Sequence, residues 1–201
     1  MTPLTIVEGR AIPLALANVD TDQLIPARFM KRPRSEGYGP FLLHDLRADP
    51  QSEASRLDDP TFAGAQILIA RRNFGSGSSR EAAVYALADY GFRCILAPSF
   101  GDIFASNAVK NGVLPAIVSE DDAEMLLHET TLLTGDAVQI DLAQQIVRVG
   151  NHFVKFDIEP VWKTQLLNGW DDIDMTQSYS ASVADFIARD AHARPWAKPS
   201  S

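Results

Sequence analysis

The chain has 201 residues, of which 46% are hydrophobic and 22% charged, a composition typical of a globular protein long enough for one sizeable core. Its formal net charge of −8 argues against a nucleic-acid-binding face, because a phosphate backbone requires a basic surface. The single cysteine, Cys94, excludes an internal disulfide and also a zinc site or an iron–sulfur cluster built from this chain's thiolates alone.

The sequence indicates neither a targeting segment nor a membrane span. The first ten residues, MTPLTIVEGR, contain no basic region followed by a long apolar run. No stretch approaches the roughly 20 apolar residues of a membrane-spanning helix. We therefore expect a cytoplasmic protein that binds neither nucleic acid nor membrane, folded as one domain over residues 1–201 with a frayed tail at about 190–201.

The N-terminal third combines one apolar segment with two polar ones. Residues 4–14 are apolar and β-branched and contain Pro13, which predicts an edge hairpin or a short strand. Residues 18–42 are rich in Gly and Pro, which predicts an irregular loop outside the core, extending to about residue 45, and loops of this length are often functional. Residues 46–60 are polar and predict a surface excursion.

The centre of the chain alternates strands with helices. The expected strands are short apolar runs bounded by turn residues: 65–70, 93–98 and 113–118. The helices between them carry apolar residues at helical spacing, and we expect them over 79–90 and from a cap at Ser99 to about Lys110. Gly91 and Asn111-Gly112 stand where helices end. This order predicts a parallel α/β portion with right-handed crossovers.

The pattern changes in the C-terminal third. Residues 134–158 alternate apolar and polar side chains, with turn signals at Gln144-Gln145 and Gly150-Asn151, which predicts an antiparallel meander. A last helix is expected over 161–167. We expect the acidic residues 170–174 to form a solvated loop rather than a subunit interface.

The segment NFGSGSS, residues 73–79, lies between an expected strand and an expected helix, and six of its seven residues are Gly, Ser or Asn. The first N–H groups of a helix have no intrahelical acceptors, and the helix dipole adds positive charge there, so carboxylates and phosphates bind such places. Gly75 and Gly77 permit close backbone approach, and Arg80 offers a bidentate fork to a carboxylate. The segment therefore predicts a cradle for a small anion.

Other interpretations of this segment are open or excluded by its spacing. Ser78 and Glu81 fit a capping box, with Ser78 as N-cap, and such a cap would need no ligand. A P-loop is excluded because residues 70–88 contain no lysine, and a dinucleotide fingerprint because Arg80 stands at the place of its third glycine. A nucleophile elbow requires a serine centred between two glycines, and none of the serines has that spacing.

Three segments together resemble a known family. They are NFGSGSSREAAVYALADYGFRCILAPSFGDIFASNAVKNGVLP, NVDTDQLIPARF upstream and LLNGWDDI downstream. They are similar to the small subunits of bacterial 3-isopropylmalate dehydratase, which are homologous to the swivelling domain of aconitase. The resemblance implies a swivelling β/β/α domain with a parallel α/β portion and antiparallel strands. It also implies a hydro-lyase of leucine biosynthesis that interconverts 2-isopropylmalate and 3-isopropylmalate through 2-isopropylmaleate.

The resemblance further implies that this chain binds no metal itself. A [4Fe–4S] cluster is expected in a separate large subunit, which agrees with the single cysteine, and a small dicarboxylate is the expected substrate. The isolated chain could form a homo-oligomer. Two alternatives stay open: the small subunit of a related hydratase acting on citraconate, 2-methylmalate or dimethylmaleate, and an anion-binding module without catalysis.

The resemblance assigns catalytic roles to three residues. Ser78 takes the position of a serine that removes the proton next to a carboxylate, and Arg80 that of an arginine that binds a substrate carboxyl group. Because a serine hydroxyl is a weak base, the positive helix end must stabilise its alkoxide. Asp22 is expected to position Ser78 or Arg80, although an Asx turn is the simpler alternative.

The remaining candidates are substrate-binding residues. Ser79 is expected to donate to a substrate carboxylate or to the neighbouring oxyanion, Gly77 to line the cradle and Asn107 to orient the substrate. One arginine of the loop over residues 18–45 is expected to bind substrate, and the sequence leaves three candidates: Arg28, Arg32 and Arg34. Phe29 and Met30 of the same loop are expected to contact the isopropyl group.

Overall fold

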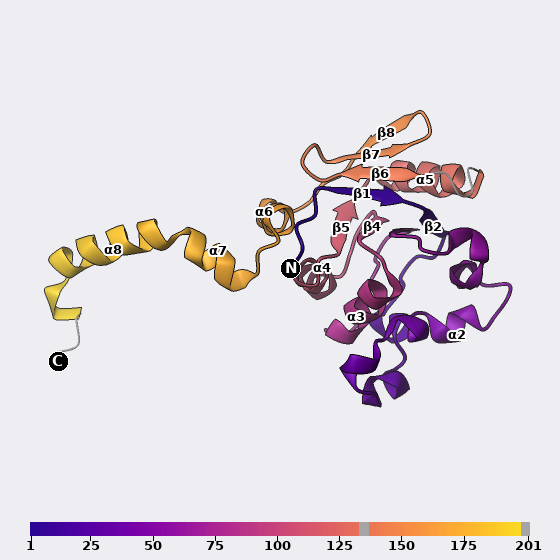
Figure 1. The fold of residues 1–201 in the computed structure, drawn as a ribbon, viewed down its shortest axis with the longest axis horizontal. Helices are drawn as coiled ribbons and strands as arrows, with labels where there is room; N and C mark the ends of the chain where they lie inside the picture. Colours follow the sequence, from indigo (N-terminus) through magenta and orange to yellow (C-terminus); the bar gives the residue numbers. More distant parts are fainter. Residues whose placement is uncertain (133–136, 198–201) are drawn as a thin grey trace. The chain divides into compact units, whose positions relative to one another are not determined.

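The computed structural model describes residues 1–132 and 137–197, which divide into two compact units, residues 1–169 and the residues from Trp170 onward (Figure 1). Within the described residues, the first unit holds two four-stranded sheets. The antiparallel sheet has the order β1 (Ile6–Gly9), β6 (Val138–Asp141), β7 (Ile146–Val149), β8 (His152–Lys155). The parallel sheet has the order β2 (Ala11–Leu14), β3 (Ile67–Ala70), β4 (Cys94–Ala97), β5 (Leu114–Ile117). The helices of this unit are α1 (Thr21–Leu24), α2 (His44–Arg47), α3 (Glu81–Tyr90), α4 (Asp102–Lys110), α5 (Glu120–Leu132) and α6 (Pro160–Asn168).

The two faces of the parallel sheet face two separate cores. Every residue of β2, β3 and β4 is buried, as expected for short apolar strands that are covered on both sides. Leu68 and Ile95 point into a core shared with α3 and α4, whereas Ile67 and Cys94 point into a core shared with α5 and the antiparallel sheet. Figure 1 shows the antiparallel sheet and α5 on one side of β4 and β5, and α3 on the other. The predicted α/β fold with parallel and antiparallel portions is confirmed.

Of the two structures expected for residues 4–14, short strands are confirmed and a hairpin is wrong. β1 pairs antiparallel with β6, with Val7 opposite Ile140, whereas β2 pairs parallel with β3, with Ile12 opposite Leu68. The chain therefore passes from one sheet to the other between Gly9 and Ala11. β2 is an edge strand, as its proline indicates, because proline lacks the N–H group that a central strand donates.

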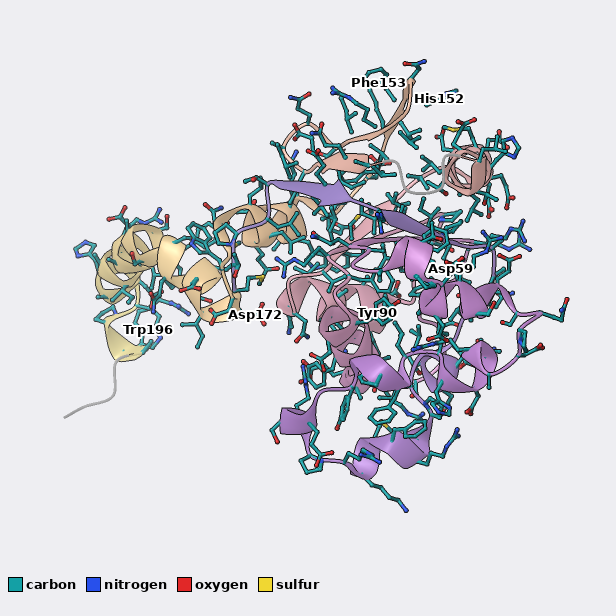
Figure 2. The ribbon with its side chains drawn as sticks, turned by 45° about the vertical axis from the view of Figure 1, so that its right-hand side comes forward. Asp59, Tyr90, His152, Phe153, Asp172 and Trp196 are labelled. Atoms are coloured by element: carbon teal, nitrogen blue, oxygen red, sulfur yellow. The ribbon has the colours of Figure 1, made fainter. Side chains whose placement is uncertain are left out.

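The segment from Asn18 to Phe62 contributes to the core, contrary to the predicted loop and surface excursion. It forms α1, α2 and a series of short 3-10 turns: Ala27–Lys31, Arg34–Glu36, Gly39–Phe41, Glu53–Asp58 and Pro60–Phe62. Leu24, Ile25, Leu42 and Leu43 are completely buried. The hydroxyl of Tyr90, at the end of α3, donates to the Leu57 carbonyl at 2.6 Å and so connects this segment to the helix. Tyr90 is labelled in Figure 2.

The helix ends are predicted correctly and the helix starts are not. Gly91, with φ of +120°, ends α3, and Asn111 caps the end of α4. α3 begins at Glu81 with Arg80 as N-cap and without a side-chain cap, so the alternative interpretation of Ser78 as the N-cap of a capping box is wrong. Ser99 does not cap α4 either, because its hydroxyl accepts a hydrogen bond from the Asn73 N–H group at 2.8 Å.

The C-terminal strands and α6 match the prediction, whereas one helix, α5, was not predicted. The meander β6–β7–β8 is confirmed from residue 137 onward, while its expected start at Thr134 lies outside the described residues. α6 is confirmed with its end at Gly169. The sequence reasoning missed α5, which packs against β2 and β3.

The second unit is helical. It contains α7 (Asp172–Ser178), α8 (Ser180–Ala193) and a 3-10 turn over Pro195–Ala197; Asp172 and Trp196 are labelled in Figure 2. The expected solvated loop over residues 170–174 is wrong, because Asp171 caps α7 through hydrogen bonds from the Ile173 and Asp174 N–H groups. α8 runs past residue 190, where fraying was expected to begin, and residues 198–201 lie outside the described residues. The single domain over 1–201 stays a prediction. No helix among the described residues is long and apolar enough to cross a membrane.

Candidate active site

The Gly- and Ser-rich segment lies where the loops after three parallel strands meet. The carboxyl ends of neighbouring parallel strands share one edge of a sheet, which is the usual position of ligand sites in α/β folds. Here the loop after β3 is held by the loop after β2: Gly75 N–H donates to the Val19 carbonyl at 2.7 Å, and Thr21 N–H to the Ser76 carbonyl at 3.0 Å. The loop after β4 holds its other side, because Gly101 N–H donates to the Phe74 carbonyl at 2.9 Å. The serine turn is thus fixed by backbone hydrogen bonds on both sides.

A shallow cavity of about 180 Å³ opens at this turn. It is lined by residues 75–78 on one side and by residues 101–104 on the other. Residues 102–104 are the first turn of α4, whose N–H groups lack intrahelical acceptors and carry the positive end of the helix dipole. From the sequence, we expected positive charge from the start of α3 alone. The structure shows that the start of α4 also faces the cavity. Ser78 is exposed beside this cavity, so an anionic ligand can reach it.

Close packing also accounts for two glycines of this site. Gly75 has φ of +72°, and a Cβ atom there would lie 2.6 Å from Cδ1 of Phe104. A Cβ atom on Gly101 would lie 2.6 Å from the Gly75 carbonyl oxygen. Phe104 in turn packs edge-on against the fully buried Phe74, with ring centroids 5.5 Å apart. These glycines therefore let the serine turn and the start of α4 approach each other.

The hydroxyl of Thr21 lies against Ser78. Its Oγ1 atom is 3.2 Å from Ser78 Oγ, 3.2 Å from the Ser78 carbonyl oxygen and 3.3 Å from the Ser78 nitrogen. Thr21 is the first residue of α1, which begins with a capping box between Asp20 and Gln23. The sequence reasoning did not select Thr21.

Asp22 lies on Arg80 and not on Ser78. Arg80 Nη1 donates to Asp22 Oδ1, and the two form an ion pair between the first turn of α1 and the residue before α3. The Arg80 side chain is 28% exposed and that of Asp22 is 60% exposed, so solvent and ligands reach both groups. Asp22 was expected to position either Ser78 or Arg80, and in the structure it is paired with Arg80.

The three loop arginines bind acidic groups of this chain. Arg28 pairs with Asp45, Arg32 with Glu36 at 3.5 Å, and Arg34 with Asp89. The Arg34–Asp89 pair is bidentate, at 2.6 and 2.8 Å, and Arg34 also lies over the Tyr85 ring at 4.4 Å. Asp89 is in the last turn of α3, at the opposite end from Ser78. None of the three arginines lines the cavity, so their contact with substrate stays a prediction.

Of the other predicted substrate-binding residues, Gly77 alone lines the cavity. Gly77 lines it with φ of +94°, and Ser79 is exposed next to it. Asn107 is half-buried on α4 and does not line the cavity. Phe29 stacks on Phe41 at 4.4 Å, outside the cavity lining. Met30 packs against the core instead of lining the cavity.

The sequence reasoning missed the contribution of α4 to this cavity. Asp102 and Ile103 line it, together with Phe104. The segment SFGDIF follows β4 directly, and β4 pairs with β3 in parallel. Since loops after adjacent parallel strands meet at one edge, that order was the available signal.

The residues of this chain do not fit an iron–sulfur cluster. Cys94 is fully buried in β4, and burial raises the pKa of its thiol, so the thiolate that binds iron is disfavoured. Among residues 1–132 and 137–197, no group of three or more His, Cys, Asp or Glu side chains could hold a metal ion.

Comparisons with known proteins give the following matches. Residues 1–121 match the family described as the aconitase C-terminal domain. The 3-isopropylmalate dehydratase small subunit of Shouchella clausii is 42% identical over 192 residues, covering 94% of this chain and 97% of that protein. The 3-isopropylmalate dehydratase of Rhizopus niveus is 42% identical over 201 residues, covering 98% of this chain and 26% of that protein. The crystal structure of 3-isopropylmalate dehydratase from Methanocaldococcus jannaschii has a TM-score of 0.66 at 24% identity, covering 90% of this chain and 98% of that one, and supports the fold alone.

Proposed function

The chain belongs to the family of 3-isopropylmalate dehydratase small subunits, and we propose from this membership that it is the small subunit of a hydro-lyase. The enzyme would interconvert 2-isopropylmalate and 3-isopropylmalate through 2-isopropylmaleate, a step of leucine biosynthesis. The observation that carries the proposal is the exposed Ser78 at a cavity lined by the start of α4, beside an arginine held by Asp22. This arrangement suits a small dicarboxylate, because it combines a hydroxyl with fixed positive charge.

Ser78 is proposed to act as the base. Its alkoxide would remove the proton from the carbon next to a substrate carboxylate, and would return it in the reverse reaction. A serine hydroxyl is a weak acid, so the alkoxide needs preorganised positive groups. The first turn of α4 and the guanidinium of Arg80 supply them, and neither must reorganise when charge develops.

Arg80 is proposed to bind a substrate carboxylate. In this structure its Nη1 atom is occupied by Asp22, which leaves its remaining N–H groups for a ligand. Asp22 would therefore hold the guanidinium in place. Ser79 and Gly77, next to Ser78, are proposed to donate a hydroxyl hydrogen bond and to leave room for the ligand, respectively.

We place the [4Fe–4S] cluster in a large subunit, which would supply the Lewis acid for departure of the substrate hydroxyl group. The Rhizopus niveus relative supports the existence of such a partner, because this chain corresponds to only 26% of that protein's length. The single buried cysteine supports the assignment of the cluster to the partner.

Reconstitution tests this function. The purified chain is mixed anaerobically with candidate large subunits, and the absorbance of the unsaturated diacid is followed with 3-isopropylmalate, 2-methylmalate and a dimethylmalate as substrates. We expect turnover of 3-isopropylmalate by the mixture and none by either chain alone. Turnover of 2-methylmalate or of dimethylmalate, without turnover of 3-isopropylmalate, would assign the chain to a related hydratase. Anion binding without turnover in any combination would contradict the catalytic function.

A further inference from the structure

Thr21 is a buried polar residue at the edge of the candidate active site. Its relative exposure is 1%, so water does not compete for its hydroxyl. In the part of the chain that the structure describes, the hydrogen bonds of this hydroxyl all go to Ser78: to its backbone nitrogen, its carbonyl oxygen and its Oγ atom. A hydroxyl used only to fasten the turn would not need to contact the Ser78 side chain.

The hydrogen-bond inventory limits what Thr21 can do. The Ser78 N–H group donates to Thr21 Oγ1 at 3.3 Å, which leaves one proton on the threonine hydroxyl to donate. That proton has two acceptors at the same distance of 3.2 Å, the Ser78 carbonyl and Ser78 Oγ. The carbonyl already accepts a hydrogen bond from the Arg80 N–H group at 2.9 Å. The threonine proton can therefore turn to Oγ without leaving the carbonyl unsatisfied.

We propose that Thr21 is a positioning residue that stabilises the Ser78 alkoxide by donating its hydroxyl hydrogen bond to Oγ. This inference rests on the proposed function of Ser78 as the base. No proton leaves Thr21: its O–H group turns from the carbonyl to the alkoxide as the negative charge forms. Since the hydroxyl oxygen is held in place and shielded from water, only its O–H bond has to rotate when the charge forms.

The backbone around Thr21 explains its fixed position. Its N–H group donates to the Ser76 carbonyl at 3.0 Å, and its own carbonyl accepts from Ile25 N–H at 3.1 Å. The side chain thus projects from a helix start that is bonded to the serine turn on one side and to its own helix on the other. Replacement of the hydroxyl alone leaves both backbone hydrogen bonds in place.

The test uses Thr21→Val in the enzyme reconstituted with its large subunit, with kcat and KM measured separately. Loss of one oxyanion donor lowers kcat by about a hundredfold near neutral pH. We expect KM to change little while kcat falls, because the hydroxyl acts on the charge that forms at Ser78 in the transition state and not on the bound substrate. Thr21→Ser keeps the hydroxyl and is expected to recover most of the activity.

The matched control is Thr130→Val on α5, another buried threonine, whose hydroxyl donates to the Leu126 carbonyl at 2.7 Å. It is expected to leave both kcat and KM unchanged. If Thr21→Val does not fold, Thr21→Ala removes the same hydroxyl with less steric demand and is measured in the same way.

Two results would overturn the role of Thr21: an unchanged kcat in Thr21→Val, or a kcat in Thr21→Ser that is as low as in Thr21→Val, which indicates a structural role alone. Failure of the proposed function would give a different result: Ser78→Ala would keep full activity, which would show that Ser78 is not the base. Loss of activity in Ser78→Ala together with normal activity in Thr21→Val would refute only the present inference.

Discussion

Substitution Gly75→Ala tests how closely the serine turn and the start of α4 pack. An alanine Cβ atom would overlap the Phe104 ring, which is itself held by Phe74 and Phe100. A residue other than glycine at φ of +72° costs about 1–2 kcal/mol, and forcing extra atoms into a packed site costs about 1–3 kcal/mol. We expect the unfolding free energy to fall by the sum of the two, about 2–5 kcal/mol.

Gly64→Ala is the matched control for this prediction. Gly64 has φ of +74°, and a Cβ atom there would meet nothing within 4 Å, so only the backbone cost applies. The difference between the two variants isolates the packing cost of about 1–3 kcal/mol, or about 2–12 °C in Tm for a chain of this size. Thermal and urea unfolding followed by circular dichroism measure it. The reasoning is refuted if Gly75→Ala is no less stable than Gly64→Ala.

Three further predictions concern charges and the thiol. Asp22→Asn is expected to raise KM and lower kcat, because Arg80 loses its ion pair. The free energy of unfolding should change by less than about 1 kcal/mol, since the pair is partly exposed to solvent. Unchanged kcat and KM would contradict the role of Asp22. A hydrogen bond from Arg28 lowers the pKa of Asp45 to about 2, so this carboxylate adds stability above its unfolded pKa that is lost as the pH falls toward 2. Asp45→Asn should reduce the acid dependence of urea unfolding by less than about 1 kcal/mol, and an unaltered dependence would contradict it. Cys94 is completely buried, so iodoacetamide at pH 8 should label it only after unfolding, as mass spectrometry checks, and labelling of the folded chain would argue against its burial.

The central strands and helix ends were predictable because their signals are local. Residues 65–70 and 93–98 are apolar runs bounded by turn residues, and Gly91 supplies the positive φ that ends a helix. α5 was missed although Ser119 and Asp122 form a recognisable helix start, with Asp122 N–H donating to the Ser119 hydroxyl at 3.0 Å. Its apolar residues are few and mixed with acidic ones, so tertiary packing decides its position.

The segment over residues 18–62 shows what sequence reasoning could not supply. Its buried leucines lie in or directly beside short helical turns separated by Gly and Pro, and such turns are too short to show a periodicity. The contact of Thr21 with Ser78 joins residues 57 positions apart, which only the pairing of β2 with β3 brings together. The predicted cluster of Ser78, Arg80 and Asp22 followed from the family resemblance, whereas the part played by α4 required the strand order.

The central claim is that Ser78 acts as the base at a cavity that a large subunit completes. The most direct measurement is kcat of the reconstituted enzyme carrying Ser78→Ala, with assembly of the complex verified by size-exclusion chromatography. We predict that the complex assembles as the unsubstituted chain does and that kcat falls by about 10²–10⁴-fold, the range expected for loss of a general base. Normal turnover by an equally assembled complex would contradict the claim.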